Sequence, residues 1–176
     1  MTTLVVGGAA SGKSAYAEGL VLASPYPRRI YIATMEPMDE ECLRRIEKHR
    51  RMRAEKRFET LECYTGLGAL DLPPGSVALL ECVGNLCANE LYSPRGSGNR
   101  AAEEILRGVE RLKRQCGDLV VVSNEVFTGG GRWEEGTMEY LRQLAEVNRG
   151  VAALADNVCE VAGGIPVYYK GKEPAA

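Results

Sequence analysis

Short apolar runs, rich in valine and isoleucine, alternate along the chain with longer segments of mixed polarity. Within the runs the hydrophobic residues are continuous, which is typical of parallel strands buried on both faces. The pattern predicts strands at Thr3–Val6, Arg29–Ala33, Val77–Leu80, Leu119–Val122, Val158–Ala162 and Val167–Lys170.

Between these runs, apolar residues recur every three or four positions, which is the spacing of amphipathic helices. The spacing predicts helices at Ala101–Arg114 and Glu135–Asn148. Their apolar faces would carry Ile105, Leu106, Val109 and Leu112, and Met138, Leu141 and Leu144. A helix is also predicted at Lys13–Ala23, after a glycine-rich turn, and at Asp39–Arg57, which opens with acidic and ends with basic residues. Segments with Pro, Gly and Ser predict loops at Asp71–Ser76, Ser93–Asn99 and Thr128–Gly136.

The repeated order of strand, helix and strand predicts an α/β fold in which helices flank a mostly parallel sheet. No internal repeat and no linker-like segment interrupts the sequence. We therefore expect residues 1–176 to form a single domain.

The composition excludes several classes of protein. A net charge of −2 gives no reason to expect nucleic acid as a partner. No run approaches the ~18 apolar residues of a membrane helix, and the first residues lack the pattern of a signal peptide, which favours the cytoplasm. Six cysteines without a C-x-x-C pair, beside one histidine, argue against a zinc site and for reduced thiols.

The clearest chemical motif lies near the start of the chain, where G-x-x-x-x-G-K-S joins the first predicted strand to the first predicted helix. The backbone N–H groups of such a loop surround phosphate oxygens, its lysine lies near the β- and γ-phosphates, and its serine hydroxyl binds Mg²⁺. The flanking elements favour a nucleotide phosphate site over a chance glycine turn. The residues of this loop are Gly7, Gly8, Ala9, Ala10, Ser11, Gly12, Lys13 and Ser14.

A carboxylate at the end of a neighbouring strand would complete a magnesium site. Glu81 directly follows the strand Val77–Leu80, and we expect it to bind Mg²⁺ directly or through water. Glu125 follows another strand and is the weaker alternative. Both would lie at the carboxyl edge of the sheet, where open α/β sheets bind ligands. The simpler interpretation is a carboxylate that only begins a loop.

The single histidine, His49, lies at the edge of the apolar stripe of a predicted helix. A structural role is the simpler interpretation for an isolated histidine in this position. However, six of the ten residues from Lys48 to Arg57 are basic in a slightly acidic protein. Such a helix could face a triphosphate, and its histidine could attack phosphorus to form a phosphoramidate.

Seven motifs, in order and over most of the chain, resemble those of the bifunctional adenosylcobinamide kinase/adenosylcobinamide-phosphate guanylyltransferases of cobalamin biosynthesis. They are V-V-G-G-A-A-S-G-K-S at the start, Y-I-A-T at Tyr31–Thr34, R-I-x-x-H-R at Arg45–Arg50, T-L-E at Thr60–Glu62, L-L-E-C at Leu79–Cys82, V-S-N-E-V at Val122–Val126 and A-D-N-V at Ala155–Val158.

The resemblance implies a RecA-like P-loop fold, a homotrimer and two reactions. A nucleoside triphosphate, ATP or GTP, phosphorylates adenosylcobinamide. GTP then guanylylates a histidine, which by its place in R-I-x-x-H-R matches His49, and GMP passes to adenosylcobinamide phosphate. Besides the phosphate loop, the resemblance implies GTP contacts at Ala33, Thr34, Met35, Arg50, Arg51, Met52, Arg53, Glu62 and Glu81.

The chain departs from the family pattern in four places. Ala54 follows Arg53 where the family has proline after arginine, and Phe58 stands in the place of a tryptophan. Residues Phe127–Trp133 replace a stretch with Val-Pro, and Asn148-Arg149 replaces Asn-Gln. Two alternatives therefore stay open: a P-loop kinase with one activity, or a nucleotidyltransferase with another acceptor. A GTP-dependent switch is disfavoured because N-K-x-D is absent.

Overall fold

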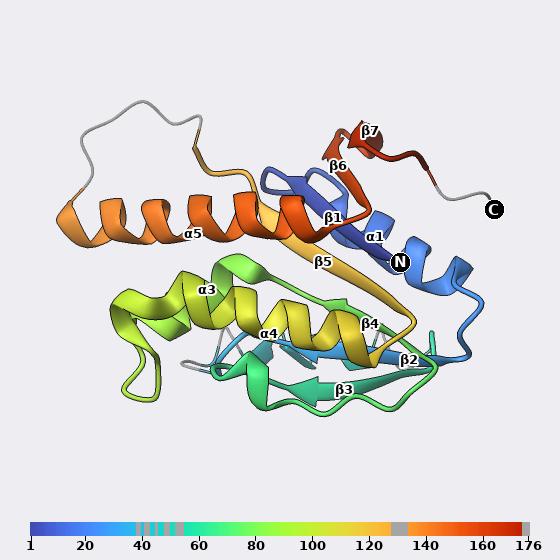
Figure 1. The fold of residues 1–176 in the computed structure, drawn as a ribbon, viewed down its shortest axis with the longest axis horizontal. Helices are drawn as coiled ribbons and strands as arrows, with labels where there is room; N and C mark the ends of the chain where they lie inside the picture. The colour runs from blue at the N-terminus through green and yellow to red at the C-terminus, as the bar shows by residue number, and fades with distance from the viewer. Residues whose placement is uncertain are drawn as a thin grey trace.

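The computed structural model describes residues 1–37, 40, 43–44, 46–47, 50–51, 55–127 and 134–173. Within them, seven strands form one sheet in the order β3-β2-β4-β5-β1-β6-β7 (Figure 1). The strands are β1 (Thr2–Gly7), β2 (Arg28–Ala33), β3 (Phe58–Glu62), β4 (Ser76–Leu80), β5 (Asp118–Asn124), β6 (Asn157–Ala162) and β7 (Ile165–Lys170). The helices are α1 (Lys13–Ala23), α3 (Val83–Tyr92), α4 (Ala101–Gln115) and α5 (Glu135–Leu154), with the 3-10 turns η1 (Leu67–Ala69) and η2 (Gly98–Arg100).

Neighbouring strands run parallel except for β6 and β7, which form an antiparallel hairpin. Gly163 and Gly164 join the two strands with φ angles of 57° and 82°. A two-residue hairpin turn with two positive φ angles favours glycine at both positions. Strand β5 lies between β1 and β4, as in RecA-like sheets. The predicted α/β P-loop fold is confirmed.

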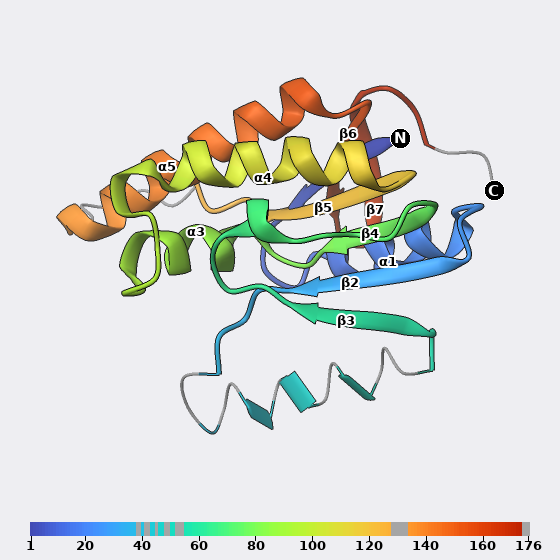
Figure 2. The ribbon, with the colours of Figure 1, turned by 60° about the horizontal axis from the view of Figure 1, so that its bottom comes forward.

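The sheet is covered on both faces, which explains the continuous apolar runs. Side chains alternate along each strand, so β5 directs Val120 and Val122 toward one core and Leu119 and Val121 toward the other. Among the described helices, α1 covers the face that carries Val120 and Val122, called the first face here. Helices α3, α4 and α5 cover the second face, which carries Leu119 and Val121 (Figure 2). No helix of the described residues has the length and apolar character needed to cross a membrane.

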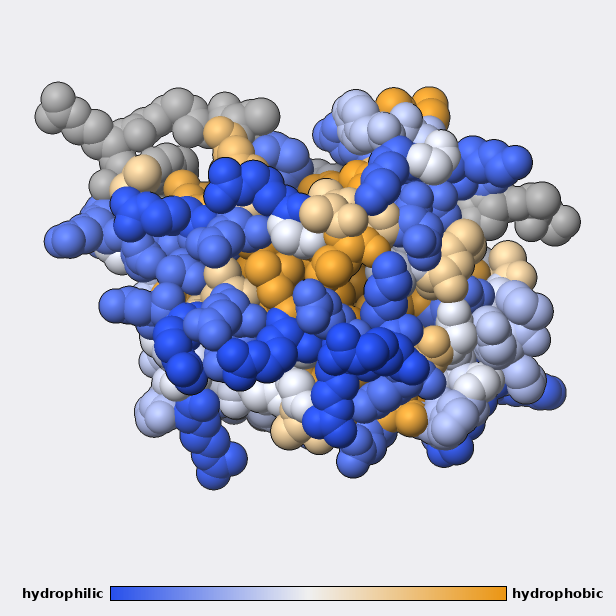
Figure 3. Space-filling model, in the orientation of Figure 1, coloured by the Kyte–Doolittle hydropathy of each residue, from blue (hydrophilic) through white to orange (hydrophobic). Residues whose placement is uncertain are grey.

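Helices α4 and α5 pack closely on the second face. Figure 3 shows apolar residues between these two helices and polar residues over their outer surfaces. Helix α4 turns Ile105, Val109 and Leu112 into the core. At Gly150 of α5, a Cβ atom would lie only 2.5 Å from the side chain of Leu106, so a larger residue here would have to displace the end of that leucine.

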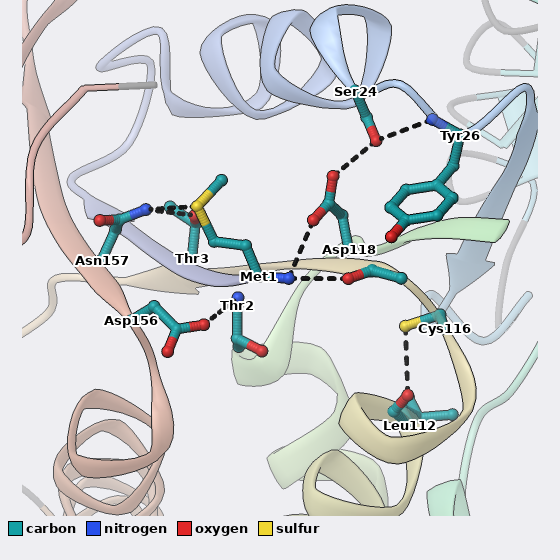
Figure 4. A network of polar contacts seen from close by, with 11 residues as sticks. Met1, Thr2, Thr3, Ser24, Tyr26, Leu112, Cys116, Asp118, Asp156 and Asn157 are labelled. Atoms are coloured by element: carbon teal, nitrogen blue, oxygen red, sulfur yellow. Dashed lines mark hydrogen bonds and ion pairs between the residues drawn. The ribbon is translucent and has the colours of Figure 1, made fainter. Parts of the chain in front are cut away.

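Polar contacts tie the elements together at the amino ends of the central strands (Figure 4). The Ser24 hydroxyl, just after α1, donates to the Asp118 carboxylate of β5 at 2.6 Å. The backbone N–H of Thr2 donates to the Asp156 carboxylate at 2.7 Å, just before β6. These contacts hold the edge of the sheet opposite the phosphate loop, so they are structural.

The structure confirms all six predicted strands and three predicted helices, with shifts at their ends. Ser76 begins a strand, although it was expected in a loop. Helix α5 begins at Glu135, as the predicted helix Glu135–Asn148 does, so the predicted loop Thr128–Gly136 extended too far. Helix α5 also extends to Leu154, beyond the predicted end. The expected burial of Met138 was wrong, since its side chain is 44% exposed, whereas Leu144 is fully buried.

The predicted helix Asp39–Arg57 is described only in part. The described positions 40, 43–44, 46–47 and 50–51 are helical. Residues Glu55–Arg57 instead form a turn, and Arg57 has a φ of 58°, which ends the helix earlier than predicted. Most of the predicted loop Thr128–Gly136 lies outside the described residues.

Strand β3 and helix α3 were not predicted from the sequence, for separate reasons. Strand β3 forms the edge of the sheet, so its pattern is mostly polar and exposed. Helix α3 contains Gly84 and two asparagines, which lower helix propensity. Its first N–H groups are capped by an unusual residue, since the Cys82 thiol accepts from the Asn85 N–H, whereas Ser, Thr, Asp and Asn are the usual caps.

Candidate nucleotide-binding site

The glycine-rich loop connects the carboxyl end of β1 to the amino end of α1, as the motif requires. Gly12, directly before the helix, has a φ of 92°, and its side-chain-free position provides no cap to the N–H groups of the first turn. At Gly7, a Cβ atom would lie 2.5 Å from the Ser11 Oγ and 2.8 Å from the Val161 carbonyl oxygen. The loop can therefore fold this tightly only with glycine at both positions, and it leaves backbone N–H groups available to an anion.

Two side chains of the loop are poised for phosphate. The Lys13 ammonium donates to the Gly8 carbonyl at 3.0 Å, so the positive charge is held at the loop. The Ser11 Oγ is buried and has no hydrogen-bond partner among the residues that the structure describes, which is rare for a buried polar atom. A phosphate oxygen would satisfy this hydroxyl. The Ser14 side chain is exposed in the first turn of α1, where a metal ion bound to phosphate could reach it.

Glu81 lies at the carboxyl edge of the sheet, as predicted. Its Oε2 accepts from the Thr34 N–H at 3.3 Å, which ties the ends of β4 and β2 together. Thr34 is held in turn, because its hydroxyl donates to the Cys82 carbonyl and its own carbonyl accepts from the Asn89 amide. With β5 between β4 and β1, Glu81 lies about 10 Å from the phosphate loop across two strand spacings.

The donor set suits a hard cation. Among the described residues, no group of three or more His, Cys, Asp and Glu side chains could hold a metal ion. Magnesium needs no such cage, because it usually binds one or two protein oxygens together with substrate phosphates and water. The Ser14 hydroxyl and the Glu81 carboxylate are oxygen ligands of this kind, so the residues present fit Mg²⁺.

A second cluster of predicted contacts lies at the far edge of the sheet. The Glu62 carboxylate, at the end of β3, pairs with the Arg50 guanidinium and accepts from the Tyr64 hydroxyl at 3.0 Å. The pKa of Tyr64 is raised, mainly because its hydroxyl is partly buried and also because it donates this hydrogen bond. Glu62 and Tyr64 also line a groove of about 670 Å³, together with Glu36 and Arg95.

The structure thus brings the predicted site residues into two groups. The phosphate loop and Glu81 lie near the middle of the carboxyl edge, whereas Arg50 and Glu62 lie at its β3 end. Between them, Ala33 ends β2, and Thr34 and Met35 follow it. Arg51 pairs with Glu47 one helical turn away. His49, Met52 and Arg53 lie outside the described residues. Glu125, the weaker metal candidate, accepts from the Phe127 N–H.

One polar residue at this edge was not among the predicted site residues. Asn124 is the last residue of β5, directly beside the phosphate loop. The signal was present, since a polar residue that ends a buried strand was the reason for choosing Glu81. The neighbouring Glu125 was the predicted residue, because a carboxylate is a better metal ligand than an amide.

A parallel strand followed by G-x-x-x-x-G-K-S and a helix, at the carboxyl edge of an α/β sheet, defines this chain as a P-loop nucleotide-binding protein. Residues 3–169 match the family described as "Cobinamide kinase / cobinamide phosphate guanyltransferase". The chain belongs to this family of transferases, as the sequence motifs predicted.

Curated relatives cover almost the whole chain. "Bifunctional adenosylcobalamin biosynthesis protein CobU" of Salmonella typhimurium is 34% identical over 97% of this chain and 100% of the relative. The protein of the same description from Escherichia coli is 36% identical, with the same coverage. "Bifunctional adenosylcobalamin biosynthesis protein CobP" of Pseudomonas aeruginosa is 30% identical over 98% of this chain and 99% of the relative.

Proposed function

We propose that this enzyme phosphorylates adenosylcobinamide with a nucleoside triphosphate and then transfers GMP from GTP to adenosylcobinamide phosphate. The observation that carries the proposal is a fully formed phosphate loop in a chain that belongs to the cobinamide kinase/guanylyltransferase family. The two reactions share one need, which is to hold a triphosphate while a nucleophile attacks one of its phosphorus atoms.

In the kinase reaction, we propose that the loop N–H groups and Lys13 hold the β- and γ-phosphates. The acceptor hydroxyl attacks the γ-phosphorus, the bond to the bridging oxygen breaks, and a nucleoside diphosphate leaves. Ser14 and Glu81 would hold Mg²⁺, which when bound neutralises charge on the phosphate oxygens. The Thr34 N–H orients the Glu81 carboxylate for this role.

In the guanylyl transfer, we propose that an imidazole nitrogen of His49 attacks the α-phosphorus of GTP and pyrophosphate leaves. A phosphate oxygen of the acceptor then attacks the guanylyl-histidine, which frees the imidazole. Arg50, the next residue, contacts Glu62 at the β3 end of the carboxyl edge. This contact supports a placement of the cationic helix along the same edge that carries the phosphate loop.

The distance between the two groups of residues suits one extended nucleotide. Strands β1 and β3 are four strand spacings apart in the sheet, which is a distance of about 19 Å. A nucleoside triphosphate with its terminal phosphates in the loop would extend along this edge toward Glu62. The predicted GTP contacts at Ala33, Thr34 and Met35 lie on the way.

Covalent labelling tests this proposal. After incubation with Mg²⁺ and GTP labelled in the α-phosphate, we expect radiolabel on the protein that is stable to base and labile to acid. The intact mass should rise by one GMP. GTP labelled in the γ-phosphate should leave no label, because that phosphate departs in pyrophosphate.

The variant His49→Ala should lose the label completely while it keeps its affinity for GTP, because the phosphate loop is unchanged. Equal labelling of this variant would refute the nucleophile. A wild-type protein that transfers the γ-phosphoryl group but never carries GMP would instead support the alternative, a P-loop kinase with one activity.

We further propose a homo-oligomer, the trimer that the family resemblance implies, located in the cytoplasm. In the exposed edge strand β7, Ile165, Val167 and Tyr169 project from one face with 67%, 48% and 69% of their surfaces accessible. An apolar edge of this kind favours association. The five described cysteines are not disulfide-bonded, in keeping with a reducing compartment.

Light scattering tests the oligomer. We expect the wild-type mass to be a multiple of 19.1 kDa, and Ile165→Glu to lower it because a charge would be buried at the contact. The exposed Leu43→Glu, on another element, should leave the mass unchanged. A wild-type monomer would contradict the proposal.

A further inference from the structure

A cavity lies on the first face of the sheet, at the end of α1 that is remote from the phosphate loop, and neither reaction above uses it. We infer that this cavity is a binding site for a small bicyclic aromatic molecule that carries one N–H donor. The inference goes beyond the proposed function, because it requires neither a bound nucleotide nor a particular acceptor.

The first step is the position of the cavity. It lies between the last turn of α1 and the first residues of β1 and β5, and its walls include Leu20 and Ala23 from the helix, Thr3 from β1, and Asp118 and Val120 from β5. The 11 residues of α1 span about 16 Å at the rise of an α-helix. This length of helix separates the cavity from the phosphate loop, so the cavity is a separate site.

The second step is the size of the cavity. Its volume is about 220 Å³. An apolar cavity of about 150 Å³ is large enough to bind benzene, so this cavity has room for a second, fused ring. Pockets for drug-sized ligands have volumes of about 300–1,000 Å³, and a nucleoside triphosphate is larger still than the space available here. The volume therefore selects a ligand of one or two rings.

The third step is the character of the walls, which are mostly hydrocarbon. Leu20 is half-buried on the helix side, and Val120 is buried on the sheet side. The Thr3 hydroxyl already accepts from the Asn157 amide at 3.4 Å, so it is engaged with a neighbouring strand. An aromatic ring buries a large apolar area with few rotatable bonds, which suits a space between a helix and a sheet.

The fourth step is the polar group in the wall. The Asp118 carboxylate points toward α1, between the Ser24 hydroxyl and the Met1 amino group (Figure 4). Its Oδ2 accepts from Ser24 at 2.6 Å and its Oδ1 accepts from Met1 at 2.9 Å. A carboxylate has about four lone-pair positions, so these two contacts leave room for another donor. Only 16% of this side chain is exposed, and a hydrogen bond in such surroundings is stronger than in water.

The fifth step is the charge around the cavity, which selects a neutral donor. The Asp118 carboxylate is already paired with the Met1 ammonium, so a cationic ligand would have to share a carboxylate that is neutralised. An anion would be repelled by this carboxylate and by the partial negative charge at the end of α1. Basic residues are absent from the last turn of α1, which the structure describes in full. A neutral N–H group satisfies all three conditions, and indole is the simplest bicyclic molecule that carries one.

Titration with indole tests the inference directly. We expect isothermal titration calorimetry to show saturable binding of one indole per chain, and NMR to show the largest amide shifts at Thr3, Ser24 and Val120. Benzofuran has the same shape as indole but lacks the N–H group. It should bind about tenfold to a hundredfold more weakly, as expected for a lost hydrogen bond to a charged group.

Three variants locate the binding in this cavity. Ala23→Leu fills the cavity from its exposed rim, so it should abolish saturable binding of both molecules without disturbing the core. Ala153→Leu, the matched control, changes an exposed alanine near the end of α5 and should leave both affinities unchanged. Asp118→Asn keeps the shape but replaces one acceptor oxygen with a donor, so it should weaken indole and leave benzofuran within about twofold.

The inference is overturned if indole does not saturate the wild-type protein, if Ala23→Leu binds indole as tightly as the wild type, or if the largest amide shifts lie elsewhere. Equal affinities of the wild type for indole and benzofuran would overturn the choice of an N–H donor. Melting temperatures identify any variant that fails to fold, and if Asp118→Asn does so, the comparison of the two molecules on the wild type carries the test. Absence of covalent GMP labelling in a protein that binds indole would refute only the guanylyl transfer.

Discussion

Replacing Lys13 with alanine is expected to lower the rate of both transfer reactions by a factor of about 10² to 10³, the usual cost of removing one preorganised electrostatic contact to a transition state. The ammonium already lies over the phosphate loop, bonded to the Gly8 carbonyl. Without it, the negative charge that reaches the leaving phosphate loses the cation that the phosphate loop itself provides. Steady-state kinetics with ATP and GTP, and covalent GMP labelling, measure the loss.

Lys113→Ala is the matched control for this experiment. Its Nζ donates to the Leu154 carbonyl near the end of α5, far along the chain from the phosphate loop, so both rates should stay within about twofold of the wild type. Rates of the Lys13→Ala protein near those of the wild type would show that the loop does not hold the reacting phosphates.

Replacing Glu90 with alanine is expected to destabilise the fold by about 2–4 kcal/mol, since each buried donor left without a partner costs about 1–3 kcal/mol. Only 2% of this carboxylate residue is exposed. Its two oxygens accept from the Gly66 N–H at 2.6 Å, from the Ser97 N–H at 2.9 Å and from the Ser97 hydroxyl at 2.8 Å.

Equilibrium unfolding in urea measures this change in the free energy of unfolding. Glu90→Gln keeps the shape and one acceptor oxygen, so it should cost less than alanine. Glu103→Ala, an exposed position on α4, should change stability by no more than about 0.5 kcal/mol. A Glu90→Ala protein as stable as the wild type would mean that water replaces the carboxylate.

The Glu90 contacts also bear on the groove at the far edge of the sheet. Gly66, Ser93 and Arg95 are among the residues that line this groove. The carboxylate binds Gly66 directly and binds Ser97, two residues after Arg95, so it helps to hold both segments in place. We therefore expect Glu90→Ala to weaken GTP binding even at a temperature where the protein stays folded.

The sequence predicted the sheet and the phosphate loop well because both depend on local patterns. A strand buried on two faces, such as β1 or β5, is apolar throughout, and the glycines of the loop are required by its own backbone. Strand β3 depends instead on one neighbouring strand, and α3 on the cap that Cys82 provides. Such elements are set by tertiary contacts that no local pattern records.

The site divides in the same way. Residues that directly follow buried strands, such as Glu81, could be placed at the carboxyl edge from the strand pattern alone. The pairing of Glu62 with Arg50, and the cavity that α1 forms with β1 and β5, join segments far apart in sequence and could not be inferred. The role of His49 and the single-domain organisation remain predictions.

The hairpin of β6 and β7 has a consequence for how the enzyme acquires its activity. The Gly164 N–H donates to the Ser11 carbonyl at 2.8 Å, and its Cα lies 3.1 Å from the position of a Cβ at Gly12. The phosphate loop is thus braced by a hairpin that comes much later in the sequence. A nascent chain that lacks this hairpin has an unsupported anion cradle, and bound nucleotide will in turn favour the docked hairpin, because a ligand stabilises the state that binds it.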